Sequence, residues 1–305
     1  MLTSRRNFLK DCGGLAAVAA LPDFKFPTDP RQRIAVASYP FRAFIDAPRN
    51  RDRERGKPGM PLTGFAHMVV VKFGVHAIEP LDAHFASTEP AYLKQLRTSV
   101  EKAGAHIVNI PVDLRDSVYD PDDAARARAV QTARKWIDAA SAVGSPGVRV
   151  HVARTPRSKP DVDRAAASLK EVAAYSAPRN IIVSLENDDL VSEDAFFLVK
   201  VIEKVNSPYL RALPDFCNSM LSGDEGFNYA AVEAMFRHAT NIAHVKDSEA
   251  PGGRVYRVDV ARTFAIAKKA GYRGYFSMEW EGEGGPYEGT ASLIEQTLAA
   301  LQRSG

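Results

Sequence analysis

The sequence predicts a (β/α)8 barrel, and two observations support that prediction. From Arg31 to the C-terminus, short apolar runs typical of buried strands alternate with longer amphipathic stretches typical of helices. There are eight such runs, and eight regular strand-plus-helix units favour a single closed α/β barrel over an open, doubly wound sheet. The runs begin at Ile34, His76, His106, Gly147, Asn180, Tyr209, Asn241 and Gly274.

The segments between these runs have the character of amphipathic helices. Clear examples cover residues 91–104, 127–144, 163–176 and 195–205. A glycine or asparagine often stands where such a helix gives way to the next strand, because these residues readily adopt the left-handed conformation that ends a helix. The residues concerned are Gly104, Gly144, Asn206 and Gly271.

We expect one barrel domain over residues 31–305, preceded by an export signal and linker over residues 1–30. The motif Ser-Arg-Arg-Asn-Phe-Leu-Lys at Ser4–Lys10 precedes a Gly/Ala-rich stretch that is too short to span a bilayer. This pattern resembles a twin-arginine (Tat) signal peptide. We therefore expect a periplasmic or secreted protein that is not attached to the membrane after signal removal.

Charge and cysteine content narrow the function further. The signal carries three basic residues and one acidic residue, so its removal lowers the formal net charge from +3 to +1. A nearly neutral protein lacks the basic surface that binds nucleic acid or anionic membranes, so we expect neither partner. Cys217 would be the remaining cysteine, so stability must come from a hydrophobic core and not from an internal disulfide. The sequence does not indicate an oligomeric state.

Four polar residues end the last four apolar runs, namely Glu186, Asp215, His244 and Glu279. The gaps between them are 29, 29 and 35 residues, about one strand-plus-helix unit each. Side chains at the C-terminal ends of neighbouring barrel strands converge at one mouth of the barrel. Three carboxylates and one imidazole suit a single divalent metal ion. This oxygen-rich set favours Mn²⁺ or Mg²⁺ and tolerates Co²⁺ or Zn²⁺.

With these residues in place, the chain resembles the sugar phosphate isomerase/epimerase family, the xylose isomerase-like TIM barrels. That family includes tagatose 3-epimerase and inosose dehydratase. The resemblance implies that Glu186, Asp215, His244 and Glu279 bind the metal and that Glu186 and Glu279 also transfer protons. It is carried by the segments GVHAIEPL (74–81), SLEN (184–187), DFCN (215–218), HVKD (244–247) and SMEWEG (277–282).

The implied activity is metal-dependent isomerisation or epimerisation of a free sugar or keto-sugar through a metal-stabilised enediolate. A second reading stays open, because many epimerase relatives have His-x-His where this chain has His244-Val-Lys246. A catalytic lysine beside the metal could donate a proton to a leaving group. Lys246 would then serve a lyase or dehydratase that eliminates from a 3-keto-glycoside or dehydrates a keto-polyol. An ion pair with Asp247 or Glu281 is its alternative role.

Four further residues are candidates for substrate binding. Glu79 and His151 lie at the ends of the second and fourth runs, and Asn218 stands where many epimerase relatives carry a histidine. Arg254 lies in the loop after the seventh run. The charged stretch 47–61 follows the first run and is either a lid or a solvated insertion. Exported proteins seldom meet sugar phosphates, so we expect a non-phosphorylated carbohydrate as the partner.

Overall fold

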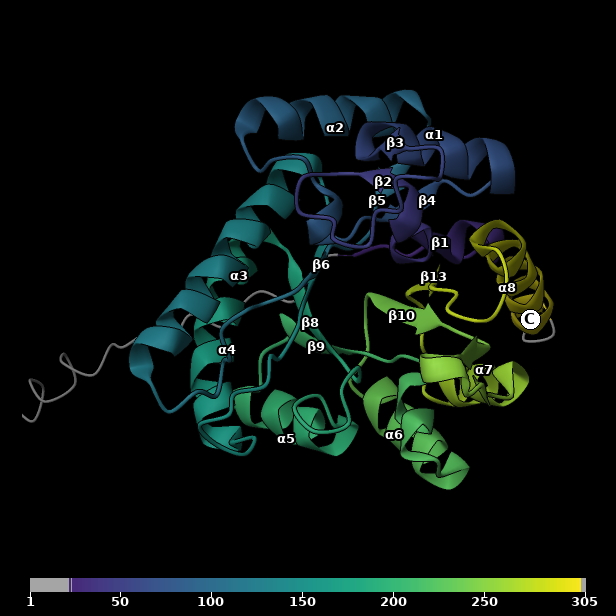
Figure 1. Ribbon diagram of the computed structural model, residues 1–305. Coiled ribbons are helices and arrows are strands. Elements are labelled where there is room, and N and C mark those ends of the chain that lie inside the picture. The colour runs from purple at the N-terminus through teal and green to yellow at the C-terminus, as the bar shows by residue number, and fades with distance from the viewer. Residues whose placement is uncertain (1–21, 23, 303–305) are drawn as a thin grey trace, which may run out of the picture.

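The computed structural model describes residue 22 and residues 24–302, and it confirms the predicted barrel (Figure 1). Helices surround a central set of parallel strands in Figure 1. The helices are α1 (Leu62–Phe73), α2 (Pro90–Lys102), α3 (Asp123–Val143), α4 (Val162–Ser176), α5 (Ala195–Val205), α6 (Glu225–Phe236), α7 (Val260–Lys269) and α8 (Pro286–Gln302).

The barrel strands follow the eight predicted runs, with the third run divided into two short strands. The strands are β1 (Ile34–Ala37), β4 (Ala77–Glu79), β5 (His106–Ile107), β6 (Pro111–Val112), β7 (Gly147–Val150), β8 (Ile182–Glu186), β9 (Leu210–Leu213), β10 (Ile242–Val245) and β13 (Tyr275–Met278). Their pairing is parallel in the orders β10-β13-β1-β4-β5 and β6-β7-β8-β9.

Backbone hydrogen bonds join these two groups of strands into a barrel. The Val108 N–H donates to the Ile78 carbonyl and the Ile110 N–H to the Gly147 carbonyl, so residues 106–112 act as one strand. On the other side, the His244 N–H donates to the Pro214 carbonyl at 2.9 Å. That bond places the residue after Pro214, Asp215, directly beside His244.

The helix ends explain why the units repeat so regularly. Gly104, Gly144, Asn206 and Gly271, all predicted to end helices, have positive φ angles between 49° and 79°. Helix starts carry aspartate caps: the carboxylates of Asp122, Asp161, Asp194, Asp224 and Asp259 each accept a backbone N–H from the first turn of the following helix.

The core has two parts. The larger part lies between the strands and the surrounding helices, and it includes Phe276 of β13. The smaller part fills the barrel interior with Ala35, Ala77, Val108, Leu213 and Ile242, all buried. This interior packing closes the barrel below the C-terminal ends of the strands.

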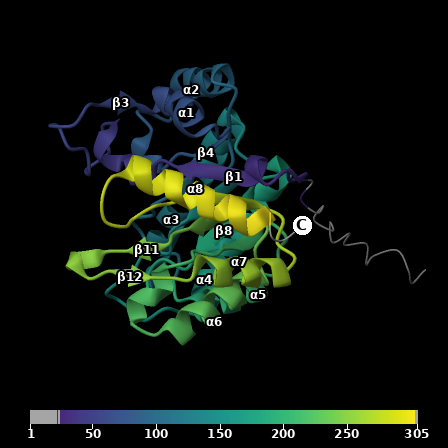
Figure 2. The ribbon, with the colours of Figure 1, turned by 90° about the vertical axis from the view of Figure 1, so that its right-hand side faces the viewer.

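Two loops extend beyond the C-terminal ends of the strands. One joins β2 (Ile45–Asp46) to β3 (Met60–Pro61), and the other contains the antiparallel pair β11 (Ser248–Glu249) and β12 (Tyr256–Arg257). Figure 2 shows both on the side of the barrel opposite the C-terminus.

The predicted export signal lies almost wholly outside the described residues. Within the described linker, the Phe26 ring packs edge-on against Tyr275 with centroids 6.0 Å apart. Among residue 22 and residues 24–302, no helix combines the length and apolar character needed to cross a membrane.

Candidate metal centre and active site

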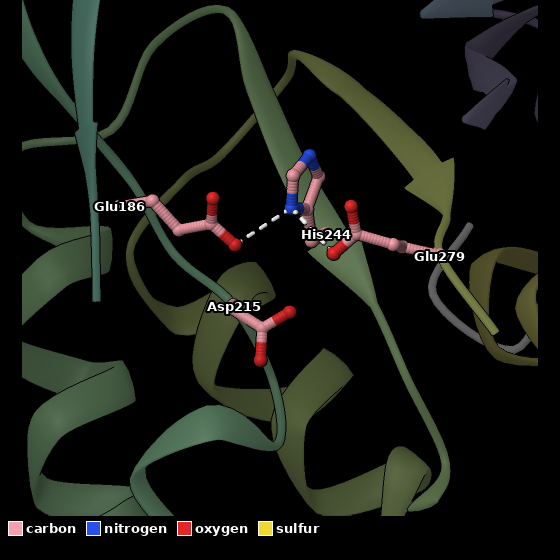
Figure 3. A group of neighbouring side chains, drawn as sticks. All are labelled: Glu186, Asp215, His244 and Glu279. Atoms are coloured by element: carbon pink, nitrogen blue, oxygen red, sulfur yellow. Dashed lines mark hydrogen bonds and ion pairs between the residues drawn. The ribbon is translucent and has the colours of Figure 1, made fainter. Parts of the chain in front are cut away.

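The structure brings together the four residues that end the last four apolar runs. Glu186 ends β8, Asp215 follows β9, His244 lies in β10 and Glu279 follows β13. Each offers a nitrogen or oxygen atom, and these atoms all lie within 4.8 Å of one another. In Figure 3, Glu186 and Glu279 reach toward His244 from opposite sides, and Asp215 lies below them. All four side chains are buried.

His244 presents its Nδ1 atom to the centre of this group. Nδ1 lies 2.8 Å from Glu186 Oε1 and 3.0 Å from Glu279 Oε2. On the other edge of the ring, Nε2 lies 3.0 Å from Glu79 Oε2. A carboxylate behind a histidine is the usual arrangement that fixes the ring of a metal ligand and directs its other nitrogen at the ion.

Glu79 therefore stands behind His244. Its carboxylate is fully buried and also accepts a hydrogen bond from Asn109 Nδ2 at 2.7 Å. The sequence placed Glu79 in the substrate pocket, and it is not among the residues that line the cavity described below. The alternation of side chains along strands gave no indication that this particular carboxylate would meet His244 from 165 residues away.

Asp215 supplies the strongest sign that a cation belongs here. Its Oδ1 accepts the backbone N–H groups of Cys217 and Asn218 at 2.8 and 2.7 Å. Its Oδ2 is buried and has no hydrogen-bond partner among the described residues, and burial raises the pKa of the carboxyl to about 8. A buried carboxylate oxygen without a donor is costly unless a charge compensates it, and the Lys246 ammonium lies 3.7 Å away, beyond hydrogen-bond distance. The donor set therefore fits a divalent ion.

Arg149 holds the other side of Glu186. Its Nε donates to Glu186 Oε2 at 2.6 Å, so the two carboxylate oxygens of Glu186 face different partners. Burial alone would raise the pKa of Glu186, but His244 and Arg149 lower it well below its usual value, and the group is ionised. The sequence reasoning missed Arg149. Its signal was a charged residue inside the apolar run Gly147–Ala153, on the same strand face as His151.

Lys246 lies at the edge of the same group. It is beside the candidate metal centre and also pairs with Glu281, so both roles predicted from the sequence find a partner. Its ammonium donates to Asn218 Oδ1 at 2.9 Å and also contacts the Glu281 carboxylate. It lies 3.3 Å from Glu279 Oε2. Burial would lower the pKa of Lys246, but the surrounding carboxylates, Asp215 first among them, raise it well above its usual value. Lys246 is thus a charged ammonium that faces the candidate metal centre.

A cavity of about 540 Å³ lies over the strand ends and includes Tyr39, His151 and Asp188 in its lining. Arg49 to Asp52, from the loop between β2 and β3, form part of its wall. Arg49 is held there because its guanidinium donates to Asp82 Oδ2 at 3.2 Å. The charged stretch 47–61 therefore contributes to the cavity.

The remaining predicted substrate residues lie in different places. His151 lines the cavity, and Asn218 contacts Glu186 as well as Lys246, with Nδ2 3.4 Å from Glu186 Oε1. Arg254 is exposed on the loop between β11 and β12, with its guanidinium 4.6 Å from the Tyr256 ring centroid. It is not among the residues that line this cavity.

A model of the xylose isomerase-like TIM barrel family matches residues 69–303. None of the curated proteins matches the sequence. Solved structures with this fold include D-allulose 3-epimerase from Methylomonas sp. in complex with D-allulose, at 16% identity and TM-score 0.65, covering 92% of this chain and 99% of that one. The 3-keto-D-glucoside 4-epimerase from E. coli has 14% identity and TM-score 0.63, and the match covers 89% of this chain and 99% of that one. A probable 3-DHS dehydratase from Bacillus anthracis has 12% identity and TM-score 0.61, and the match covers 86% of this chain and 97% of that one.

Proposed function

Because this chain belongs to the xylose isomerase-like TIM barrel family, we propose that it is a metal-dependent isomerase or epimerase of a free sugar or keto-sugar. The observation that carries this proposal is the convergence of four buried residues, each with a ligand atom within 4.8 Å of the others. Structural relatives with the same fold include two sugar epimerases, one of them in complex with its sugar.

Glu186, Asp215, His244 and Glu279 would hold the ion. An oxygen-rich set with one nitrogen favours Mn²⁺ or Mg²⁺ and also accepts Co²⁺ or Zn²⁺. When bound, a divalent ion polarises the substrate carbonyl and acidifies the neighbouring C–H group.

The two glutamates are placed to move that proton. Glu186 and Glu279 flank the centre from opposite sides (Figure 3), so one can face each side of a sugar carbon. Glu186 is ionised, as a base must be, and is held by Arg149. Removal of the proton by one carboxylate and its return by the other inverts the carbon without any oxidant.

A lyase or dehydratase on the same barrel is the second candidate, and Lys246 favours it. Its ammonium lies 3.3 Å from Glu279 Oε2, beside one of the two proposed proton-transfer groups. A charged ammonium in this position can protonate a hydroxyl or alkoxide as it leaves. The same enediolate then loses its β-substituent instead of taking a proton back on carbon.

The setting of the reaction follows from the sequence. We propose export through the twin-arginine pathway, a non-phosphorylated carbohydrate as substrate, and no nucleic-acid or membrane partner for the mature protein. Release of the protein into the periplasm or medium, with the signal peptide cleaved off and the linker retained, would support this location. A full-length chain retained in the cytoplasm would contradict it.

Solvent deuterium exchange tests the activity directly. The Mn²⁺-loaded protein is incubated in D₂O with a panel of keto-sugars, and deuterium next to the carbonyl is measured by mass spectrometry. We expect exchange in at least one sugar, and a loss of about a hundred-fold or more in Glu279→Gln. Glu283→Gln, in the exposed loop four residues away, is the control and should retain activity. Exchange at the normal rate in Glu279→Gln would contradict the proposal.

Product mass separates the two candidates. Isomerisation and epimerisation conserve the mass of the sugar apart from incorporated deuterium. Elimination releases water or an alcohol and leaves an unsaturated product.

A further inference from the structure

A second group of polar side chains lies beside the candidate metal centre. His151 follows β7, and its Nδ1 lies 2.7 Å from Glu193 Oε2. Glu193 is 1% exposed, and its Oε1 accepts the backbone N–H of Val152 at 2.7 Å. Among the described residues, no hydrogen-bond donor is aligned on Oε2. The ion pair with His151 is therefore what compensates this buried carboxylate.

His151 also reaches the cavity over the barrel. Its side chain is 25% exposed and forms part of the wall together with Asp188. Arg149 joins this wall to the metal centre, because its guanidinium contacts Glu186 at 2.6 Å and Asp188 at 3.2 Å. A substrate whose carbonyl end lies at Glu186 can therefore extend toward His151.

The charges around His151 favour proton transfer over a second cation. His151, Asp188 and Glu193 do offer ligand atoms within 4.8 Å of one another. However, the Arg149 guanidinium already lies against Asp188 and repels another positive ion. Burial lowers the pKa of His151, but the Glu193 carboxylate more than offsets this, and the net effect is a raised pKa. A histidine paired with a buried carboxylate is a common acid or base.

We propose that His151, oriented by Glu193, is the general acid that protonates the leaving oxygen of a substrate whose substituent occupies this cavity. With Nδ1 beside Glu193, Nε2 is the ring nitrogen that meets the substrate. The inference rests on the elimination form of the proposed function, and it names the substrate class as keto-sugars with an O-linked substituent at the carbon β to the carbonyl.

The step balances without an oxidant or reductant. A carboxylate takes the proton from the carbon next to the carbonyl, and the C–H electron pair becomes a carbon–carbon double bond. The bond from the β-carbon to oxygen breaks, and its electron pair stays on oxygen, which takes the proton from His151 Nε2. The products are an unsaturated keto-sugar and an alcohol. The carboxylate then loses its proton to water, and His151 regains one.

Leaving-group dependence tests this role. Methyl and 4-nitrophenyl 3-keto-glucosides are compared, because a methoxide leaving group requires an acid and a nitrophenolate does not. We expect His151→Asn to slow methanol release by about a hundred-fold or more and nitrophenol release by less than about ten-fold. Glu193→Gln should likewise slow methanol release more than nitrophenol release. His106→Asn, a histidine on β5 at the other end of the barrel, is the matched control.

Deuterium exchange in the same reactions separates this inference from the proposed function. If the wild type exchanges the C–H proton but never releases the substituent, the inference fails and epimerisation stands. Equal losses for both leaving groups in His151→Asn also overturn it. If Glu193→Gln does not fold, His151→Asn alone decides, because His151 lies at the cavity wall. Two bound Mn²⁺ ions, one of them lost in His151→Asn, would overturn it in favour of a second metal site. No exchange with any keto-sugar would overturn both proposals.

Discussion

Glu79→Gln should weaken metal binding although Glu79 is not one of the four candidate ligands. Both Glu79 oxygens lie 3.0–3.1 Å from His244 Nε2, and the carboxylate is fully buried. The carboxylate fixes a proton on Nε2 and leaves the Nδ1 lone pair to face the ion. An amide at this position pairs equally well with either ring tautomer. Loss of such a supporting carboxylate typically costs about 10–100-fold in metal affinity, or about 1.4–2.7 kcal/mol.

Titration calorimetry with Mn²⁺ measures this effect on the wild type, Glu79→Gln and the control Glu101→Gln. Glu101 is exposed on α2 and pairs with Arg97, so its replacement should leave the affinity unchanged. Unaltered Mn²⁺ affinity in Glu79→Gln, together with a higher KM for the sugar, would refute the reasoning. That outcome would return Glu79 to the substrate-binding role predicted from the sequence.

Three further predictions concern stability. Burial raises the pKa of Asp82 from its usual value of 3.8 to about 6. The folded state therefore keeps this proton where the unfolded state has lost it, and stability falls as pH rises from about 4 to about 6. Asp82→Asn should remove this fall, which is about 3 kcal/mol in urea unfolding. Gly289→Ala should lower the melting temperature because a Cβ there would lie 2.3 Å from the Trp280 indole. Gly64→Ala should raise it by helix propensity, because the nearest atom to its Cβ would be Pro61 Cδ at 3.9 Å, an ordinary contact. Asp215→Asn should lose the stabilisation by Mn²⁺, about 2.7 kcal/mol at one hundred times the Kd, because it removes one of the four candidate ligands. A wild type that Mn²⁺ does not stabilise would contradict the last prediction.

Much of the fold could be predicted from the sequence because its signals are local. Apolar runs, aspartate caps and left-handed residues such as Gly144 and Asn206 act within a few positions of the chain. The division of the third strand into β5 and β6 could not be predicted in this way. It depends on pairing with Ile78 on one side and Gly147 on the other, and both partners are distant in sequence.

The four candidate ligands could be predicted because a barrel places equivalent strand ends together. Their supporting residues could not, because each meets its partner across the barrel. Glu79 on β4 meets His244 on β10, and Glu193, which is not on a strand, meets His151 after β7. Strand periodicity says which face a side chain takes, but not which partner it finds there.

Lys246 and a divalent cation would compete for the same carboxylate oxygens. The ammonium lies 3.3 Å from Glu279 Oε2 and 3.7 Å from Asp215 Oδ2, so it repels an ion held by the same oxygens. Lys246→Met should therefore bind Mn²⁺ more tightly, by about ten-fold or more, while turnover at saturating Mn²⁺ falls because the positive charge beside Glu279, one of the two proposed proton-transfer groups, is gone. Calorimetry and product assays on one preparation would show these opposite changes. If turnover of Lys246→Met instead rose with its Mn²⁺ occupancy to the wild-type level, Lys246 would serve only as the ion-pair partner of Glu281.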